Sequence, residues 1–124
     1  MAFGVKTKTD DGKPTRYFSD KQEKAIAKAV GGKQTANSGA TDFQKGDVII
    51  GGSASWLIEA KTKTSSSESI SIKKEWFEKN EYEAAEMGKK YTALAFNFGP
   101  GEPNHYIIDE WLFKELLERM KGEN

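Results

Sequence analysis

Apolar residues recur at helical spacing in some stretches of the chain and in short continuous runs in others. Near the N-terminus, a helical stripe is formed by Ile26, Ala27 and Val30. It predicts a helix over residues 20–30, begun by a Ser-x-x-Gln capping box at Ser19 and Gln22 and ended by two glycines. Glu23 precedes the stripe by three, four and seven residues, so its carboxyl is expected to face the core.

Two apolar runs lie on either side of the turn "GSAS" in the middle of the chain. They predict antiparallel strands over residues 47–51 and 56–62, preceded by a short strand over 34–36. The elements expected after them are a polar loop over 63–69, a helix over 73–87, a strand over 91–98, a strand over 105–109 and a helix over 110–120. This order predicts an α/β fold with a mixed central β-sheet flanked by α-helices.

The two later helices each have a set of apolar residues, which are packing candidates in the first helix and lie on or near one face in the second. In the first of them these residues are Trp76, Phe77, Ala84 and Met87. In the C-terminal helix they are Trp111, Leu112, Leu116 and Met120. The aromatic residues Trp76, Phe77, Phe98, Trp111 and Phe113 are candidates both for a subunit contact and for the core. Residues 1–17 show no periodicity, so we expect a flexible basic arm there and a single domain over 18–124.

The composition excludes several kinds of chemical site but says little about the fold. The 124 residues include no cysteine and a single histidine, His105. Disulfides, thiolate metal sites, multi-histidine zinc sites and most nucleophilic triads are therefore not expected. The start of the chain has no apolar core typical of a signal peptide, and no apolar run approaches the ~20 residues that span a bilayer. We expect no membrane association and a cytoplasmic location, in a bacterium or a phage-infected host cell.

Charge is balanced overall but unevenly distributed. The formal net charge is zero, yet residues 1–45 hold nine Lys or Arg against five Asp or Glu. The segment from Glu81 onward is acidic by about the same amount. The separation of basic and acidic residues along the chain permits a basic binding face in a neutral protein. It is equally compatible with charged residues that only keep the surface solvated.

Acidic residues interrupt the two central strands, where apolar side chains would be expected. Because side chains alternate along a strand, Leu57, Glu59 and Lys61 share one face, and a hairpin brings Asp47 close to them. Two neighbouring buried carboxylates repel each other, and a divalent cation such as Mg²⁺ or Mn²⁺ relieves that repulsion. Lys61 would then stand beside the metal, where it would orient or help to deprotonate a water, or neutralise charge on a phosphate. Glu23 would serve as a further ligand or as an outer acid.

The stretch "GDVIIGGSASWLIEAK" resembles the core of the PD-(D/E)xK nuclease superfamily. In that pattern a helix with a Glu is followed by an Asp that opens a strand and by Glu-x-Lys on the next strand. This chain supplies Glu23, Asp47, Glu59 and Lys61 in that order, with Gly46 in place of the nominal proline. The resemblance implies a restriction-endonuclease-like fold and hydrolysis of a DNA phosphodiester by a metal-activated water.

The wider stretch "NSGATDFQKGDVII…EAKT" is similar to archaeal-type and phage-encoded Holliday junction resolvases. The similarity implies a homodimer that cuts four-way DNA junctions by paired nicks. It implies that Asp47, Glu59 and the backbone carbonyl of Ala60 bind Mg²⁺, that Mn²⁺ can substitute, and that Lys61 is catalytic. Glu23 would complete the acidic site, and Ser38 would contact the scissile strand.

Basic side chains are the expected contacts to the DNA backbone. They are Lys6, Lys8, Lys13, Arg16, Lys33, Lys45, Lys63, Lys73 and Lys74. The loop "TKTSSSES" is expected either to contact phosphate or to be a disordered connector. No base-reading helix is evident, so recognition is expected to depend on DNA shape, and no small-molecule cofactor is expected. Two alternatives remain open: another nuclease of the same superfamily, acting in restriction, repair or flap cleavage, and a non-catalytic DNA-binding module.

Overall fold

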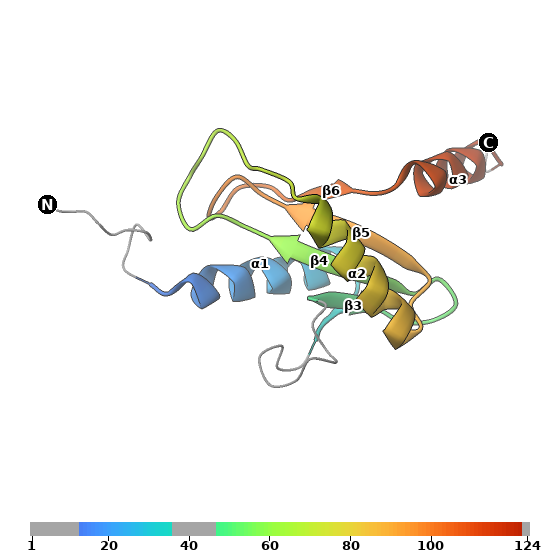
Figure 1. The fold of residues 1–124 in the computed structure, drawn as a ribbon, viewed down its shortest axis with the longest axis horizontal. Helices are drawn as coiled ribbons and strands as arrows, with labels where there is room; N and C mark the ends of the chain where they lie inside the picture. The colour runs from blue at the N-terminus through green and yellow to red at the C-terminus, as the bar shows by residue number, and fades with distance from the viewer. Residues whose placement is uncertain (1–12, 36–46, 123–124) are drawn as a thin grey trace, which may run out of the picture.

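The computed structural model describes residues 13–35 and 47–122, arranged as one sheet with three helices (Figure 1). The chain order is α1 (Thr15–Val30), β2 (Lys33–Gln34), β3 (Val48–Ile50), β4 (Trp56–Lys61), α2 (Lys74–Met87), β5 (Tyr91–Phe96), β6 (His105–Ile107) and α3 (Glu110–Gly122). These elements match the expected order, and most bounds agree within a few residues. No described helix is long and apolar enough to cross a membrane.

The five strands form a mixed sheet in the order β2-β3-β4-β5-β6. All neighbouring pairs are antiparallel except β4 and β5, which are parallel. A parallel pair needs a crossover connection, and α2 supplies it. The predicted α/β class and the β3–β4 hairpin are therefore confirmed, while the finer restriction-endonuclease-like description stays a prediction.

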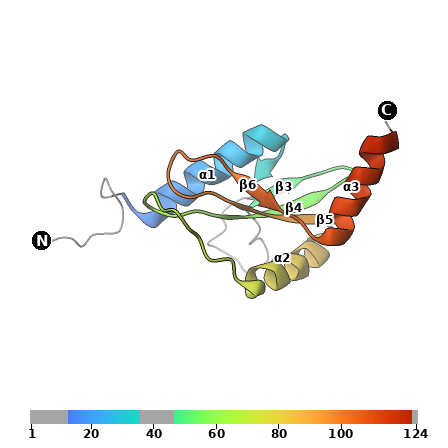
Figure 2. The ribbon, with the colours of Figure 1, turned by 90° about the horizontal axis from the view of Figure 1, so that it is seen from above.

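The helices α1 and α2 cover opposite faces of the sheet (Figure 2). On the α1 side, fully buried Ile26 packs on an apolar layer made of Val48, Ile58, Ala60, Ala93 and Ala95. Ala27 and Val30 lie beside this layer, as the helical stripe predicted. The helix α2 packs on β4 and β5 from the other side. The alternation along β4 thus sends Ile58 and Ala60 toward α1 and leaves Glu59 and Lys61 on the α2 side.

The first helix starts earlier than the capping box predicted. It begins at Thr15, after Pro14 in an extended conformation, and Ser19 lies inside the helix with its hydroxyl donating to the Arg16 carbonyl. A buried side chain, Phe18, explains the longer helix, because its contacts stabilise the first turn without a side-chain cap. Residues 15–17, expected in the arm, are therefore helical, and residues 1–12 lie outside the described residues.

The loop between β4 and α2 is held against the turn after β5. Ser67 donates its backbone N–H to the Phe98 carbonyl at 2.8 Å. Gly99, at φ +144°, approaches so closely that a Cβ there would lie 2.7 Å from the Ser66 Cα atom. The strand β5 ends at Phe96 rather than at the expected Phe98. The contact of the loop with the Phe98 carbonyl argues against the disordered-connector alternative for the loop.

Most of the apolar face of the C-terminal helix is exposed. Of the four residues on or near its predicted apolar face, only Leu112 is buried, whereas Trp111, Leu116 and Met120 are exposed. In α2, Ala84 is buried and Trp76, Phe77 and Met87 are half-buried. The predicted amphipathic helix α3 is thus present, with Leu112 as the one residue of its set that is buried. The sequence left Trp111 open between this chain's core and a subunit contact, and the structure leaves its side chain 53% exposed.

Candidate functional site

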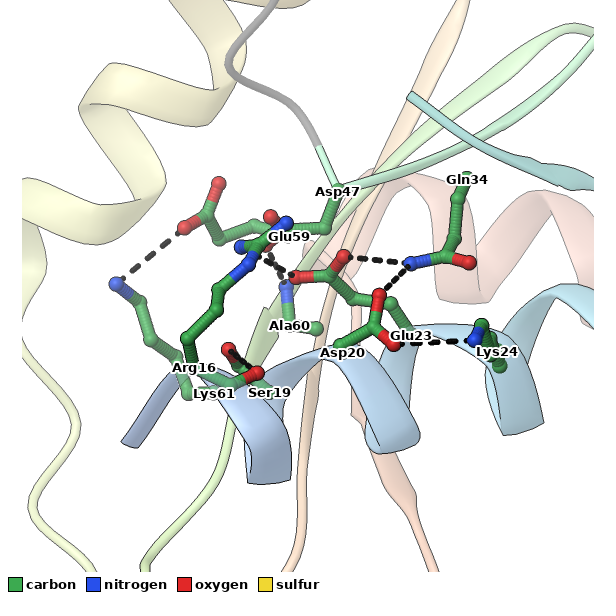
Figure 3. Close-up of polar contacts among 10 residues, drawn as sticks. All are labelled: Arg16, Ser19, Asp20, Glu23, Lys24, Gln34, Asp47, Glu59, Ala60 and Lys61. Atoms are coloured by element: carbon green, nitrogen blue, oxygen red, sulfur yellow. Dashed lines mark hydrogen bonds and ion pairs between the residues drawn. The ribbon is translucent and has the colours of Figure 1, made fainter. Parts of the chain in front are cut away.

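Asp47 lies just before β3, at the point where the β3–β4 hairpin ladder ends. Val48 is paired with Ile58, so Asp47 comes next to Glu59 across the hairpin. The Ala60 N–H donates to the Asp47 Oδ2 atom at 2.7 Å, in a position where the strand ladder provides no partner (Figure 3). The Asp47 carbonyl in turn accepts from the Thr35 N–H at 3.1 Å. These bonds fix the carboxyl between the two strands, and the predicted proximity of Asp47 to Glu59 is confirmed.

Burial and two acidic side chains, Glu59 and Glu23, determine the protonation of Asp47. Burial, and after it the negative charge of Glu59, raises the pKa of Asp47 to about 8, although the hydrogen bond from Ala60 acts in the opposite direction. The charge and hydrogen bonding of Glu23 make a smaller contribution to the same rise in the pKa. Glu23 and Glu59 therefore both lie close enough to Asp47 to influence its protonation, from opposite sides of the sheet.

Glu59 is buried in β4 with only one oxygen in a described contact. Its Oε2 lies 3.3 Å from the Lys61 Nζ, and its Oε1 is buried without a hydrogen-bond partner in the described part of the chain. Burial raises the pKa of Glu59 above its usual value, against the lowering effect of Lys61 and Lys79. A buried carboxylate oxygen without a donor is costly, and a cation is one group that would satisfy it.

Lys61 lies beside Glu59, as the strand alternation predicted, and is partly open to solvent. Its Nζ atom lies 4.6 Å above the ring centroid of Trp76 in α2. Its backbone carbonyl accepts from the Gln22 side chain in α1 at 2.9 Å. The ammonium is thus held between a carboxylate and an aromatic face, which fixes its direction while leaving it reachable from solvent.

Glu23 reaches the same end of the sheet from α1, with its side chain buried as predicted. Its Oε1 accepts from the Gln34 amide at 3.1 Å, and its Oε2 lies 4.0 Å from the Arg16 guanidinium. Gln34 also donates to Asp20 at 2.9 Å, so one amide links both acids of the helix (Figure 3). Arg16 was predicted only as a DNA contact, and its pairing with Glu23 was missed because the helix was expected to begin after it.

The helix α2 contributes an acid and a base that sequence analysis did not identify. Glu83 is buried, its Oε2 lies 3.5 Å from the Lys79 Nζ, and its Oε1 has no hydrogen-bond partner among the described residues. The charges of both residues act on Glu59. The signal was present in the sequence, because Glu83 lies seven residues after Trp76 and next to Ala84 on the inward face.

The oxygen atoms present fit a Mg²⁺ ion only in part. Two buried carboxylates, Asp47 and Glu59, lie next to each other, and Mg²⁺ is commonly held by one or two carboxylates with waters. The Ala60 carbonyl points to the same side of β4 as its N–H, toward Asp47. However, across residues 13–35 and 47–122 no group of three or more His, Asp or Glu side chains is arranged to hold a metal. Asp47, Glu59 and the Ala60 carbonyl therefore fit a Mg²⁺ ion. The predicted role of Glu23 as a further metal ligand is not supported, because its carboxylate is not grouped with the other two.

Six of the nine predicted DNA-contacting residues lie in the described part of the chain. Those in the described part are exposed or half-exposed, namely Lys13, Arg16, Lys33, Lys63, Lys73 and Lys74. Lys13 lies 4.9 Å above the Tyr17 ring, and Lys74 lies 3.9 Å from Glu78. Ser38, Lys6, Lys8 and Lys45 lie outside the described residues.

Comparisons of the chain with protein-family models, with curated proteins and with solved structures found no match. The family resemblance in the sequence therefore stays a prediction, and any function has to be proposed from the residues and their geometry.

Proposed function

We propose that this chain is a Mg²⁺-dependent endodeoxyribonuclease of the PD-(D/E)xK type. The observation that supports this most strongly is the grouping of Asp47, Glu59 and Lys61 where the β3–β4 hairpin opens. Two adjacent buried carboxylates with raised pKa values destabilise the fold, and such groups concentrate at functional sites. The lysine 3.3 Å from one of them matches a site that handles phosphate charge.

Each residue has a role that follows from its place. Asp47, Glu59 and the Ala60 carbonyl hold the metal, and Mn²⁺ can replace Mg²⁺ there. When bound, the metal supplies polarisation of the phosphate and a water of lowered pKa. Lys61 orients the attacking water or neutralises charge on the phosphate. Glu23 does not bind the metal, and its charge makes the electrostatic potential around Asp47 more negative.

The DNA backbone is bound by basic side chains on two segments around the site. Arg16 in the first turn of α1 lies within ion-pair range of Glu23. From this position its guanidinium binds the phosphate next to the scissile one. Lys63 and Lys73 bracket the loop that follows β4. Backbone contacts of this kind position the protein without reading sequence.

The substrate proposed is a four-way DNA junction, cut by paired nicks in a homodimer in the cytoplasm of a bacterium or a phage-infected cell. The test compares four-way junction, flap, linear duplex and single-stranded DNA as substrates with Mg²⁺. Paired, symmetric nicks across the junction and slow cutting of the linear forms are expected. Sequence-specific cuts in the duplex, or preferential cutting of the flap, would mean that the chain is a nuclease of the same type with a substrate other than the junction.

A non-catalytic DNA-binding module is the second candidate, and one observation favours it. The acids are already partnered by cations, Glu59 by Lys61 and Glu23 by Arg16, which is an arrangement that holds without a metal. Under this alternative, neither DNA binding nor DNA cleavage depends on Mg²⁺ or Mn²⁺. A metal titration of both properties separates the two candidates.

A further inference from the structure

A polar hollow of about 320 Å³ lies between the first half of α1 and the turn that joins β5 to β6. Phe18, Gln22 and Ala25 line it from α1, and Asn97 and Asn104 line it from the other side. Figures 1 and 2 show this turn at the end of the sheet where α1 begins. The hollow thus lies outside the carboxyl ends of the parallel strands β4 and β5, a position at which α/β folds commonly bind ligands.

Side-chain amides in the lining of this hollow form a connected network. The Gln22 Nε2 group donates to the Lys61 carbonyl at 2.9 Å and to the Asn104 Oδ1 atom at 3.1 Å. Asn97 donates to the same Asn104 oxygen at 3.2 Å, and its own Oδ1 atom accepts from the Thr62 hydroxyl. The helix α1 and the ends of β4 and β5 are therefore joined by uncharged polar groups whose orientations these bonds fix.

One acceptor and one donor group are not satisfied within this network. Gln22 is 5% exposed, and its Oε1 atom is buried without a hydrogen-bond partner in the described part of the chain. Because both hydrogens of its Nε2 group are used, the amide cannot turn over without the loss of two bonds. The Asn104 oxygen faces Gln22 and Asn97, so the Asn104 NH₂ group is directed away from both of them. A buried acceptor without a donor costs free energy, which a ligand with an N–H group would recover.

An aromatic ring with two neighbouring cations stands at the edge of the hollow. Tyr17 is 39% exposed and contacts Phe18 edge to face, with ring centroids 5.2 Å apart. The Lys13 and Lys21 ammonium groups lie 4.9 and 5.8 Å from the centre of the Tyr17 ring. An exposed ring next to cations is typical of surfaces on which nucleic-acid bases stack while their phosphates are neutralised.

We propose that this hollow binds a nucleobase, whose face stacks on Tyr17 and whose edge exchanges hydrogen bonds with Gln22 and Asn104. A nucleobase is flat and has both donors and acceptors on its edge, which matches the open groups of the amide network. A base that stacks on the Tyr17 ring moves one ammonium aside, toward its own phosphate. The volume of about 320 Å³ lies at the lower end of the range of small-ligand pockets, which is about 300 to 1,000 Å³.

Two other ligand classes fit this hollow less well. A bare phosphate requires a cation inside the site, but the charged residues that line the hollow, Lys21 and Glu102, are both exposed. A neutral carbohydrate would bond to the amides but has no negative charge for the two lysines beside Tyr17. A nucleotide combines an uncharged base with a phosphate, so it uses both the amides and the lysines.

The base would come either from a DNA strand or from a free nucleotide. Thr62 lines the hollow and directly follows Lys61, whose carbonyl is held by Gln22. A strand with a phosphate at the Lys61 ammonium would therefore pass close to the hollow, where an unpaired base at the centre of a junction would enter it. This first source rests on the proposed function, whereas nucleobase binding as such does not.

Nuclear magnetic resonance of the isotope-labelled full chain tests the hollow, in EDTA and without DNA. The probes are the four 2′-deoxynucleoside 5′-monophosphates, and the control ligand is 2-deoxyribose 5-phosphate, which has a phosphate and no base. We expect at least one nucleotide to shift the side-chain amide signals of Gln22, Asn97 and Asn104, with a dissociation constant of about 1 mM or lower. The control ligand should leave these signals in place. Equal shifts with the control, or no shift with any nucleotide at about 10 mM, would overturn the proposal.

The Tyr17→Ala variant tests the stacking contact. Because Tyr17 is exposed, the variant should fold, and we expect its affinity for the nucleotide to be lower by about 5-fold or more. The matched control is Tyr82→Ala on α2, where the side chain is 68% exposed, and its affinity should equal that of the wild type. Equal affinities of Tyr17→Ala and the wild type would contradict the proposed stacking.

A bulged duplex separates the two sources of the base. Fluorescence anisotropy in EDTA compares a fully paired duplex with one that has a single unpaired nucleotide. A base in a DNA strand predicts at least ~10-fold tighter binding of the bulged duplex and loss of this preference in Tyr17→Ala. No preference, with the nucleotide shifts retained, assigns the hollow to a free nucleotide. Nucleotide binding by a chain that cuts no DNA would support this inference and refute the nuclease proposal, and cleavage by a chain whose hollow binds no nucleotide would do the reverse.

Discussion

The backbone N–H of Ala60 donates a 2.7 Å hydrogen bond to the carboxyl of Asp47, across the end of the β3–β4 hairpin. This bond satisfies an N–H that the strand ladder leaves without a partner, and it holds an acid where an apolar residue would stabilise the fold more. The negative charges of Glu59 and Glu23 act on the same acid. The site is thus stabilised by one backbone donor and destabilised by burial and like charge.

The pH dependence of stability follows from the pKa of Asp47. Burial and Glu59 raise this pKa from its ordinary 3.8 to about 8, so the folded protein binds a proton that the unfolded chain has lost. Without metal, stability should therefore fall as the pH rises from about 4 to about 8. The Asp47→Asn variant keeps an acceptor for the Ala60 N–H and removes the penalty. We expect its melting temperature at pH 8 to exceed that of the wild type by roughly 4 °C or more, with little difference at pH 4.

Calorimetric melting in the absence of metal measures this effect. A parallel series with Mg²⁺ provides the control, because the ion should raise the melting temperature of the wild type at pH 8 and leave that of Asp47→Asn unchanged. A wild type whose stability increases steadily up to pH 8 would show that Asp47 is already ionised in the folded state.

Removal of Lys79 should destabilise the protein more than removal of a comparable surface lysine. Lys79 pairs with buried Glu83 and acts on Glu59, so a Lys79→Met variant leaves a buried acid without its cation. We expect a loss of about 1 to 2 kcal/mol in the free energy of unfolding at pH 7. The control is Lys74→Met, which breaks an exposed pair with Glu78 one turn earlier on the same helix and should cost about 0.5 kcal/mol or less. Equal losses in urea denaturation would mean that Glu83 is not held by Lys79.

Cleavage should depend on Glu59 and Lys61 while DNA binding does not. The Glu59→Gln variant keeps the size of the side chain and removes the charge that holds the metal. Lys61→Ala removes the ammonium beside the phosphate. Each change is expected to lower the rate of junction cleavage at least ~100-fold, with a dissociation constant that stays within a few-fold of wild type. Binding is measured by gel shift in Ca²⁺. Near wild-type cutting by either variant would show that the site is misassigned.

Arg16 should contribute to DNA binding through one phosphate contact. Replacement of Arg16 by Ala is expected to weaken binding and to reduce the slope of log K against log salt by about one. Lys24→Ala serves as the matched control, because Lys24 lies on the same helix and is paired with Asp20 at 3.2 Å. Deletion of residues 1–12, which removes Lys6 and Lys8, should lower the slope by about two. Identical slopes for all variants would exclude α1 and the N-terminal segment from the interface.

The local arrangement of the site was predictable because it depends on strand periodicity. Alternation alone places Glu59 and Lys61 on one face, and the short turn over residues 51–55 brings Asp47 alongside. The inward direction of Glu23 followed from its spacing to Ile26 in the same way. These are relationships between residues that are close in sequence or joined by one short turn.

The remainder of the site depends on contacts between distant segments. Gln34 reaches Glu23 and Asp20, and Lys79 acts on Glu59 from a helix that begins fifteen residues further along the chain. No local pattern distinguishes such polar residues from solvated ones. The start of α1 was missed for a related reason, because the contacts of Phe18 outweighed the capping box at Ser19.

The central claim is that Asp47, Glu59 and Lys61 form a metal-dependent nuclease site. Its most direct test is one gel that follows cleavage of a labelled four-way junction by the wild-type chain with Mg²⁺, with Mn²⁺ and with EDTA, beside the Glu59→Gln variant. The expected result is paired nicks with either metal, none with EDTA and none with the variant. Equal cleavage in EDTA, or no cleavage of any DNA in the presence of either metal, would contradict the claim.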